Sequence, residues 1–516
     1  MENTGKVTVS TGEILYWLFF GSLLFAKGIG LYDGQAVFKL VLVFATACLA
    51  LKIAIEKYTT AEMLRMLVVM ALTAMTYIIS GEKGMLLYGM MMIGMKYVNI
   101  KRLFTVGLIL WSVAFFGITI TSLFHMEDTV YKIHEKLGMG HIFRWSLGYP
   151  HPNVLQVSYI VLAIFIIYLL GDQFKLKHAF WLFVGNGLVF LYSVSYTGFI
   201  MFMVLLTGRL YLMVRKKLGF VERLLLLLVF PVCVVLSLVL PVKLQGKWFN
   251  ILNILLSSRM ELAWRYLKPE YMSLFGVKLS EITTESITMD NAYLSAFITY
   301  GAVPFALLCM ATMFVIYKYL KEEKYLEVLI ILAIAVGGLT EPFLYNTSFK
   351  NLSFVFMGAL LFGNKKRKKE WCLVPFKKLR NCNREITICL KKLQLIKELF
   401  QIVMKFDWRK CVSGIAGAVL ISIAACALIK YPEGYVVYRT ECSDLTKNRN
   451  YYEKENPEYK DFKQMKPFKI GEEIEYFSGN IVKMEKIRNQ VMGGFFGFGI
   501  IYIGYGLLEQ KTKRRK

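Results

Sequence analysis

Long apolar runs recur along most of this chain, and they limit what it can fold into more than any other feature. Each run is roughly long enough to cross the ~30 Å hydrocarbon layer of a bilayer as a helix, and hydrophobic residues make up 56% of the 516 residues. We therefore predict an all-α, polytopic integral membrane protein with about 14 transmembrane helices. The predicted spans lie near residues 13–31, 36–54, 64–80, 84–98, 103–124, 153–171, 178–193, 194–209, 221–241, 292–317, 325–339, 347–363, 411–429 and 490–508. The tenth of these is interrupted at Gly301 and Pro304, which predicts a broken helix.

The chain is also strongly basic, with 62 Lys and Arg against 36 Asp and Glu and a formal charge of +26. Such a charge alone would suggest nucleic acid, but only 19% of residues are charged, fewer than the roughly 25% of a soluble domain. The composition therefore excludes a soluble enzyme and argues against a nucleic-acid partner. Short loops rich in Lys and Arg stay in the cytoplasm. Counting spans from the basic loop at 209–223 predicts that both termini are cytoplasmic.

This topology divides the chain into three regions. Residues 1–363 form a polytopic membrane domain, 364–410 form a basic cytoplasmic linker, and 411–516 form a two-span hairpin with an extracytoplasmic segment at 430–489. The linker has 15 Lys and Arg against 4 Asp and Glu, and its apolar residues between Ile386 and Phe406 recur at helical spacing. This pattern predicts an amphipathic helix that binds anionic lipid; a solvated basic linker is the alternative.

Residues suited to chemistry gather in two large outer loops, 125–152 and 242–291. The first loop contains four of the five histidines, but no regular metal-ligand spacing, so no metal site is expected. It ends with Arg144 and then His151, Pro152 and Asn153, which combine a fixed charge, a proline-restricted turn and an amide at the end of a span. A purely structural turn is the alternative.

The second outer loop contains a potential anion site. Ser258 and Glu261 fit a capping box, which would put Arg259 at a helix N-terminus, where free backbone N–H groups attract anions. A guanidinium can hold phosphate through two parallel hydrogen bonds. Trp264 and Arg265 follow on the same predicted helix. The alternative is a solvated arginine.

Two carboxylates lie at the outer ends of later spans. Asp290 directly precedes Asn291 and a span, so it fits either a general base or a helix N-cap, and the sequence alone favours the cap. Glu341 follows Gly337-Gly338-Leu339-Thr340. Ionisable residues next to apolar runs usually have a partner, and we expect Arg259 or Arg144 to be that partner.

Taken in order, these motifs resemble the Wzy-type polysaccharide polymerases of the O-antigen polymerase/ligase superfamily. The resemblance covers roughly residues 10–363. Each motif is short. The order of the motifs along the chain and their placement on the outer face are more specific than any single motif. The matching residues are Arg144, Gly148, His151, Pro152 and Asn153; Ser195, Thr197 and Gly198; Ser258, Arg259 and Trp264; Asp290, Asn291, Tyr293, Leu294 and Gly301; and Glu341.

The resemblance implies a metal-independent glycosyltransferase without cofactors, in the cytoplasmic (inner) cell membrane. Such enzymes polymerise undecaprenyl-diphosphate-linked oligosaccharide repeat units on the outer face for capsule, exopolysaccharide or O-antigen. Further partners would be anionic lipid at 364–410 and the flippase and chain-length regulator of the same pathway. Related enzymes carry His where this chain has Asp290, so Asp290 also fits a role in orienting the acceptor.

The resemblance also suggests roles for individual residues. For the catalytic base we expect Asp290, with His151 second, and Glu341 is the third catalytic candidate. Substrate binding, to the diphosphate or the glycan, is assigned to Arg144, Arg259, Arg265, Asn153, Asn291, Trp264 and Tyr293.

Three other functions fit an outer-face membrane protein. A ligase of the same superfamily would transfer finished glycan to another acceptor. A lipid-linked oligosaccharide flippase or other transporter would favour inverted repeats and ionisable residues near the membrane midplane, and neither is clear in this sequence. A receptor or scaffold would not need Arg, Asp and His to concentrate on one side.

Overall fold

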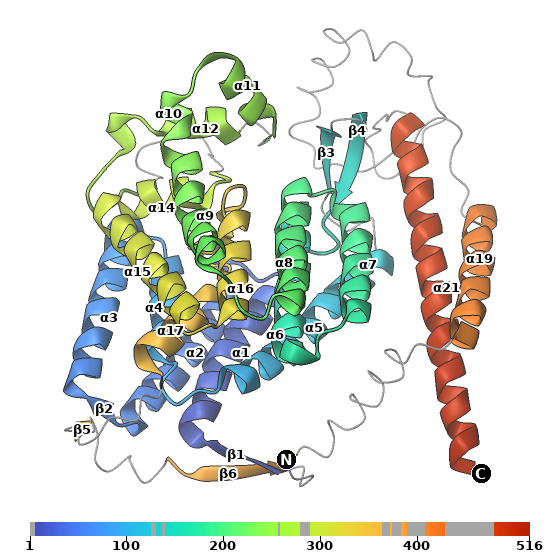
Figure 1. Ribbon diagram of the computed structural model, residues 1–516, viewed down its shortest axis with the longest axis horizontal. Helices are drawn as coiled ribbons and strands as arrows, with labels where there is room; N and C mark the ends of the chain where they lie inside the picture. The colour runs from blue at the N-terminus through green and yellow to red at the C-terminus, as the bar shows by residue number, and fades with distance from the viewer. Residues whose placement is uncertain are drawn as a thin grey trace.

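Helices make up most of the computed structural model of this chain and stand side by side as a bundle (Figure 1). The structure describes residues 6–124, 131–136, 140–255, 259–278, 289–363, 372–373, 383–389, 408–428 and 479–515. The helices are α1 (Thr11–Gly28), α2 (Ala36–Ile55), α3 (Thr60–Ser80), α4 (Gly84–Ile93), α5 (Ile100–Phe124), α6 (Pro152–Leu170), α7 (Leu176–Ser193), α8 (Tyr196–Val214), α9 (Phe220–Leu238), α10 (Leu240–Lys243), α11 (Gly246–Leu255), α12 (Arg259–Tyr266), α14 (Ala292–Tyr300), α15 (Ala302–Lys321), α16 (Tyr325–Gly337), α17 (Ser353–Phe362), α19 (Trp408–Leu428) and α21 (Gly479–Arg515). Short 3-10 turns are η2 (Gly171–Gln173), η3 (Pro269–Tyr271) and η4 (Pro342–Leu344).

Seven helices within the described residues are long and apolar enough to cross a membrane: α2, α3, α5, α6, α8, α9 and α15. Three shorter apolar helices, α4, α16 and α17, accompany them. Every predicted span contains a helix. The chain is thus a mostly helical, membrane-embedded protein, as predicted, while the number of fourteen spans and their orientation stay predictions.

The predicted break in the tenth span is present. Helix α14 ends at Tyr300, and α15 begins at Ala302. Gly301 between them has φ +86°, and a Cβ there would lie 2.2 Å from the Gly276 nitrogen. The loop before α14 fills the break, because Ala302 and Val303 donate their N–H groups to the carbonyls of Ser273 (2.9 Å) and Leu274 (3.0 Å). Only glycine fits this close approach of two backbones.

In the described part of the chain, three two-stranded antiparallel sheets add to the helices. They pair β1 (Lys6–Ser10) with β6 (Glu385–Cys389), β2 (Tyr58–Thr59) with β5 (Cys372–Leu373), and β3 (Tyr131–Lys136) with β4 (Gly140–Trp145). Strand β6 corrects the prediction of a helix beginning at Ile386. Its β-branched residues Ile386, Thr387 and Ile388 suit a strand, and β1 supplies hydrogen-bond partners that an isolated helix pattern could not reveal. Residues 390–407 and the segment 430–478 lie outside the described part of the chain.

Helix α6 forms the centre of the bundle. In the most apolar stretch of α6, 72% of the residues are buried, against 17% in the corresponding stretches of α3 and α9. A helix that is apolar and buried all round is a core helix, whereas α3 and α9 leave apolar side chains on the outside, as lipid-facing helices do. The N-terminus of α6 is therefore a rigid platform, and the functional candidates described below gather around it.

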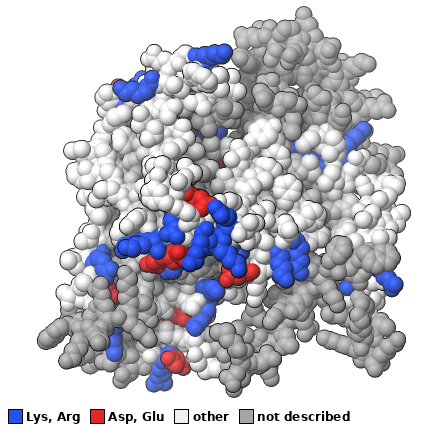
Figure 2. Space-filling view, in the orientation of Figure 1, with Lys and Arg blue, Asp and Glu red and all other residues white. Residues whose placement is uncertain are grey.

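The two ends of the bundle differ. Figure 1 shows β3, β4 and α10 to α12 at the upper end, and β1, β6 and the C-terminal end of α21 at the lower end. Figure 2, drawn in the orientation of Figure 1, shows a mixed group of basic and acidic residues near the centre and in the lower half of this face, within a largely uncharged surface. We refer to the two ends as upper and lower from here on.

Candidate functional site

Arg144 lies at the end of β4 and is only 4% exposed. Its Nε donates to the carbonyl of Ser193 at 2.8 Å, and its Nη2 donates to Oδ1 of Asn153. Burial lowers the pKa of this guanidinium to about 10, with the Glu341 carboxylate opposing the shift. The group remains a cation at neutral pH, because its pKa stays well above 7.

The N-terminus of α6 links Arg144 to an acid. His151 is the N-cap, and its Nδ1 accepts the N–H of Asn153 at 3.1 Å. Pro152 occupies the first turn, where its missing N–H costs nothing. The Asn153 side chain accepts from Arg144 and donates through Nδ2 to Oε1 of Glu341 at 2.7 Å. Asn153 therefore fixes the distance between the two charged groups.

Glu341 is the buried acid of the site and directly follows the turn that ends α16. Its Oε1 accepts from Asn153 and from the Thr197 hydroxyl (3.2 Å) and lies 3.8 Å from Nη2 of Arg259. The predicted partnership of Glu341 with an arginine is thus confirmed for Arg259. Burial raises the pKa of Glu341 to about 7, although Arg259 favours the ionised form.

Arg259 is the first residue of α12, as predicted. Its Nε donates to the Thr340 carbonyl at 3.0 Å, and its Nη2 lies 3.5 Å from Oδ2 of Asp290. The N–H of Glu261 donates to Oδ1 of Asn253 in α11 at 3.0 Å, and the predicted capping box depends on Ser258. Ser258 lies outside the described residues.

Asp290 is the accessible acid of the site, with 43% of its side chain exposed. The expectation that it caps α14 is wrong. Asn291 is the N-cap, and its Oδ1 accepts the N–H groups of Tyr293 (2.9 Å) and Leu294 (3.0 Å). The Ala292 N–H pairs with the Gly338 carbonyl, which fixes where the helix begins. Desolvation raises the pKa of Asp290, with Arg259 and then Arg144 opposing the shift.

The contacts form one continuous chain from Arg144 through Asn153, Glu341 and Arg259 to Asp290. We call these five residues the upper cluster. Its members come from five separate parts of the sequence that the fold brings to one place. Two guanidiniums can bind an anion, and a half-exposed carboxyl next to them can accept a proton.

Four other predicted site residues lie elsewhere. Arg265 is exposed and pairs with Glu261 one turn earlier on α12, and Trp264 is 54% exposed. Tyr293 is fully buried and donates to the Ala335 carbonyl at 2.7 Å. Asn291 is buried as a cap and donates to the Ser237 hydroxyl at 2.8 Å. Tyr293 and Asn291 therefore support the fold.

Lys350 was missed by the sequence analysis. It is 4% exposed, and its Nζ donates to the Ser158 hydroxyl at 2.9 Å in the second turn of α6. The ammonium lies 5.6 Å from the ring centroid of Tyr149 and 5.8 Å from that of Trp111. The sequence did contain a sign of it: a single lysine inside an apolar run is unusual in a membrane protein and normally has a structural or functional reason.

No protein-family model, no curated protein and no solved structure matches this chain.

Proposed function

We propose that this protein polymerises undecaprenyl-diphosphate-linked oligosaccharide repeat units on the outer face of the cytoplasmic membrane. The observation that carries the proposal is the convergence of Arg144 and Arg259 around Glu341, beside the half-exposed Asp290, at one end of an apolar helical bundle. The order of the sequence motifs supports this choice of substrate. The product would serve as capsule, exopolysaccharide or O-antigen.

The arginines suit a departing diphosphate. Both hydrogen bonds of Arg144 go to neutral acceptors, the Ser193 carbonyl and the Asn153 amide. Nη2 of Arg259 is 3.5 Å from Asp290 and 3.8 Å from Glu341, distances longer than a charge-assisted hydrogen bond. Two guanidiniums held close together are suited to binding phosphate oxygens. Because the cations are held in place, they stabilise negative charge as it develops on the leaving group.

Asp290 suits the base. The acceptor hydroxyl oxygen attacks the anomeric carbon of the donor sugar, while the bond from that carbon to the diphosphate oxygen breaks. The hydroxyl proton goes to Asp290, and undecaprenyl diphosphate leaves with the bonding electrons. The raised pKa of Asp290 brings it closer to working pH, where a base is most efficient. His151 is less suitable, because its Nδ1 already accepts a backbone N–H.

The remaining parts of the proposal concern partners. The apolar helix faces would contact the polyprenyl tail, and the basic residues of 364–410 would meet anionic lipid. A flippase would deliver the substrate, and a chain-length regulator would limit the product.

The test uses the purified full chain in detergent with lipid-linked repeat units, EDTA and no nucleotide sugar. We expect longer lipid-linked glycans, and Arg144→Met and Arg259→Met should each slow elongation by about 10²- to 10³-fold. Arg265→Met is the matched control, because it removes an arginine from the same helix as Arg259 but outside the upper cluster. Wild-type protein that transfers glycan only to a foreign acceptor, or only translocates the lipid, would contradict polymerisation.

A further inference from the structure

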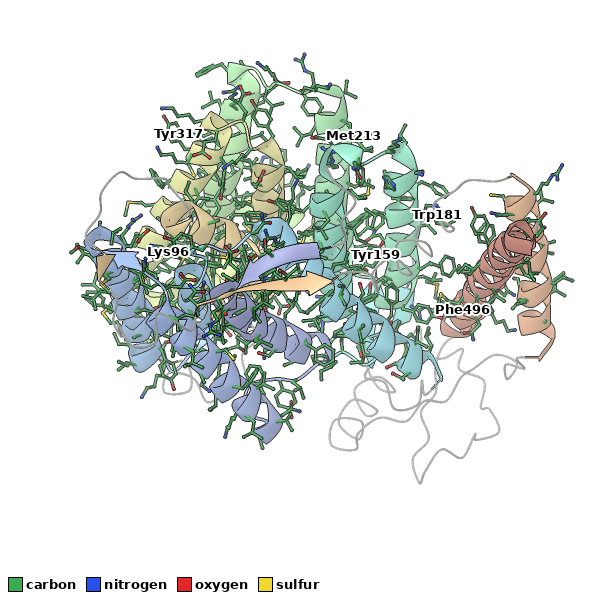
Figure 3. The ribbon with its side chains drawn as sticks, turned by 90° about the horizontal axis from the view of Figure 1, so that it is seen from below. Lys96, Tyr159, Trp181, Met213, Tyr317 and Phe496 are labelled. Atoms are coloured by element: carbon green, nitrogen blue, oxygen red, sulfur yellow. The ribbon has the colours of Figure 1, made fainter. Side chains whose placement is uncertain are left out.

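The C-terminal hairpin, which the sequence analysis left without a function, packs against the bundle. Figure 1 shows α21 between α7 and α19, and Figure 3 labels Trp181 on α7 and Phe496 on α21 near the boundary between them. The ring centroids of Trp181 and Phe498 are 6.2 Å apart. Within the hairpin, a Cβ on Gly497 would lie 2.5 Å from the Gly417 carbonyl oxygen, so glycines allow the two helices to touch.

One buried cation joins α21 to the end of α7. Arg488 is 0% exposed, and its Nε donates to the Leu191 carbonyl at 2.7 Å. Its guanidinium carbon lies 5.8 Å from the ring centroid of Tyr192. The last carbonyls of a helix have no partner inside the helix, and a cation there is favourable for the helix dipole. Arg488 therefore supplies part of the C-terminal cap of α7 from a separate segment of the chain.

Arg144 of the upper cluster caps the same helix end. Its Nε donates to the Ser193 carbonyl at 2.8 Å, two residues beyond the carbonyl that Arg488 uses. The next residue, Val194, has φ +40° and donates its N–H to the Phe190 carbonyl at 2.8 Å. A β-branched residue in the left-handed region is strained and persists where the surroundings hold it.

We propose that Arg488 is a positioning residue for the upper cluster. By holding the Leu191 carbonyl, it fixes the end of α7, and the Ser193 carbonyl then fixes the direction of the Arg144 guanidinium. Helix α21 is thus part of the support of the site. The activity part of this inference rests on the proposed function, whereas the structural part does not.

A double-mutant cycle in the elongation assay tests the connection. We expect Arg488→Met to lower kcat about tenfold to a hundredfold, as a small misplacement of a catalytic group does, and Arg488→Lys to restore part of it. In an Arg144→Met background, the same change should cost less than about twofold, because the group it positions is already gone. Lys486→Met, on an exposed part of the same helix, is the control. Losses that multiply in the double variant would overturn the inference.

Hydrogen–deuterium exchange gives a second readout that needs no substrate. We expect the amide of Val194 to exchange faster in Arg488→Met than in wild type or Lys486→Met, while amides of α16 stay unchanged. If Arg488→Met lowers the melting temperature of the whole protein, we use the milder Arg488→Lys instead, both in the double-mutant cycle and in the exchange measurement. Unchanged exchange at Val194 would overturn the inference even if the wild type elongates glycans, and absent elongation would overturn only the proposed function.

Discussion

Buried charges gather at both ends of the bundle, but the two groups are built differently. At the lower end, the side of the molecule seen in Figure 3, two ion pairs each join one cation to one carboxylate. The pairs are Arg102 with Glu13 at 3.0 Å, and Lys96 with Glu62 in direct contact. The first pair joins the N-terminal ends of α5 and α1, and the second joins the turn after α4 to the N-terminal end of α3. One-to-one pairing of this kind fixes the relative positions of helices.

In the upper cluster, by contrast, one cation lies between two carboxylates. Arg144 hydrogen-bonds to neutral groups, and Nη2 of Arg259 stands 3.5 and 3.8 Å from two carboxylates. Its acids also differ from each other, because Glu341 is buried and Asp290 is half-exposed. The contrast teaches that the geometry of pairing separates the two roles more clearly than burial does. A cation paired with one carboxylate holds the fold, whereas a cation shared between two carboxylates is suited to taking a ligand.

The largest effect should come from Asp290. We expect Asp290→Asn to lower the elongation rate about 10²- to 10⁴-fold, the usual contribution of a general base, because the amide cannot take the acceptor proton. The melting temperature should change little, since Asn291 and not Asp290 caps α14. The measurement is elongation of lipid-linked repeat units by purified protein.

Glu261→Gln is the control for this variant, because Glu261 is an acid of the same outer loop that pairs with exposed Arg265. A rate for Asp290→Asn within twofold of the wild type would remove Asp290 from the role of base.

At the lower end, the expected loss is in stability. Lys96→Met leaves Glu62, whose side chain is 14% exposed, without its cation and should destabilise the fold by up to about 3 kcal/mol, measured as thermal melting in detergent. Adding Glu62→Gln should restore much of the loss, because both charges are then gone and glutamine can still serve the capping box of α3. The folded fraction should keep its elongation rate. A normal melting temperature with a reduced rate would reverse the roles assigned to the two ends.

The sequence already predicted the main features on which this comparison depends. Apolar runs located the helices, and Gly301 with Pro304 located the break, because both signals are local. An arginine partner for Glu341, either Arg259 or Arg144, was expected because an ionisable residue next to an apolar run usually has a partner. Local patterns could not choose between Asp290 and Asn291 as the cap, since the choice depends on the Ala292 contact with Gly338.

Contacts between distant segments escaped the sequence analysis for a related reason. Strand β6 forms only because β1 lies beside it, and Arg488 acts on a helix about 300 residues earlier in the chain. Lys350 was visible as a lone charge in an apolar run, but its partner Ser158 lies on α6. Pairs of this kind depend on how distant segments pack together, and the periodicity of one segment carries no information about that packing.

A pH effect on stability should separate Glu341 from an ordinary ion pair. Burial raises its pKa from 4.5 to about 7, so the folded state favours the protonated acid. The stabilisation is complete below about pH 4.5 and is lost as the pH rises to about 7, by about 3 kcal/mol. Glu341→Gln removes this dependence, because the amide does not titrate and its oxygen can still accept from Asn153.

The measurement for Glu341 is the difference in melting temperature between wild type and Glu341→Gln across this pH range. Glu270→Gln, at a side chain that is 62% exposed, is the control and should show no such trend. We expect the wild type to lose stability relative to Glu341→Gln as the pH rises. A wild type that instead gains stability relative to Glu341→Gln would mean that Glu341 is ionised in the folded protein and paired like the acids at the lower end.

The smallest effect should come from Arg265, which the sequence motifs grouped with Arg259. The two residues lie on one helix, but Arg259 is 9% exposed by side chain and Arg265 is 62% exposed, with Glu261 one turn away as its partner. Exposed pairs at this spacing contribute about 0.3–0.5 kcal/mol, so Arg265→Ala should shift melting only slightly and leave elongation within about twofold. A loss as large as that of Arg259→Met would mean that an exposed, singly paired arginine also binds substrate. Pairing geometry would then no longer separate the charges that hold the fold from those that serve the reaction.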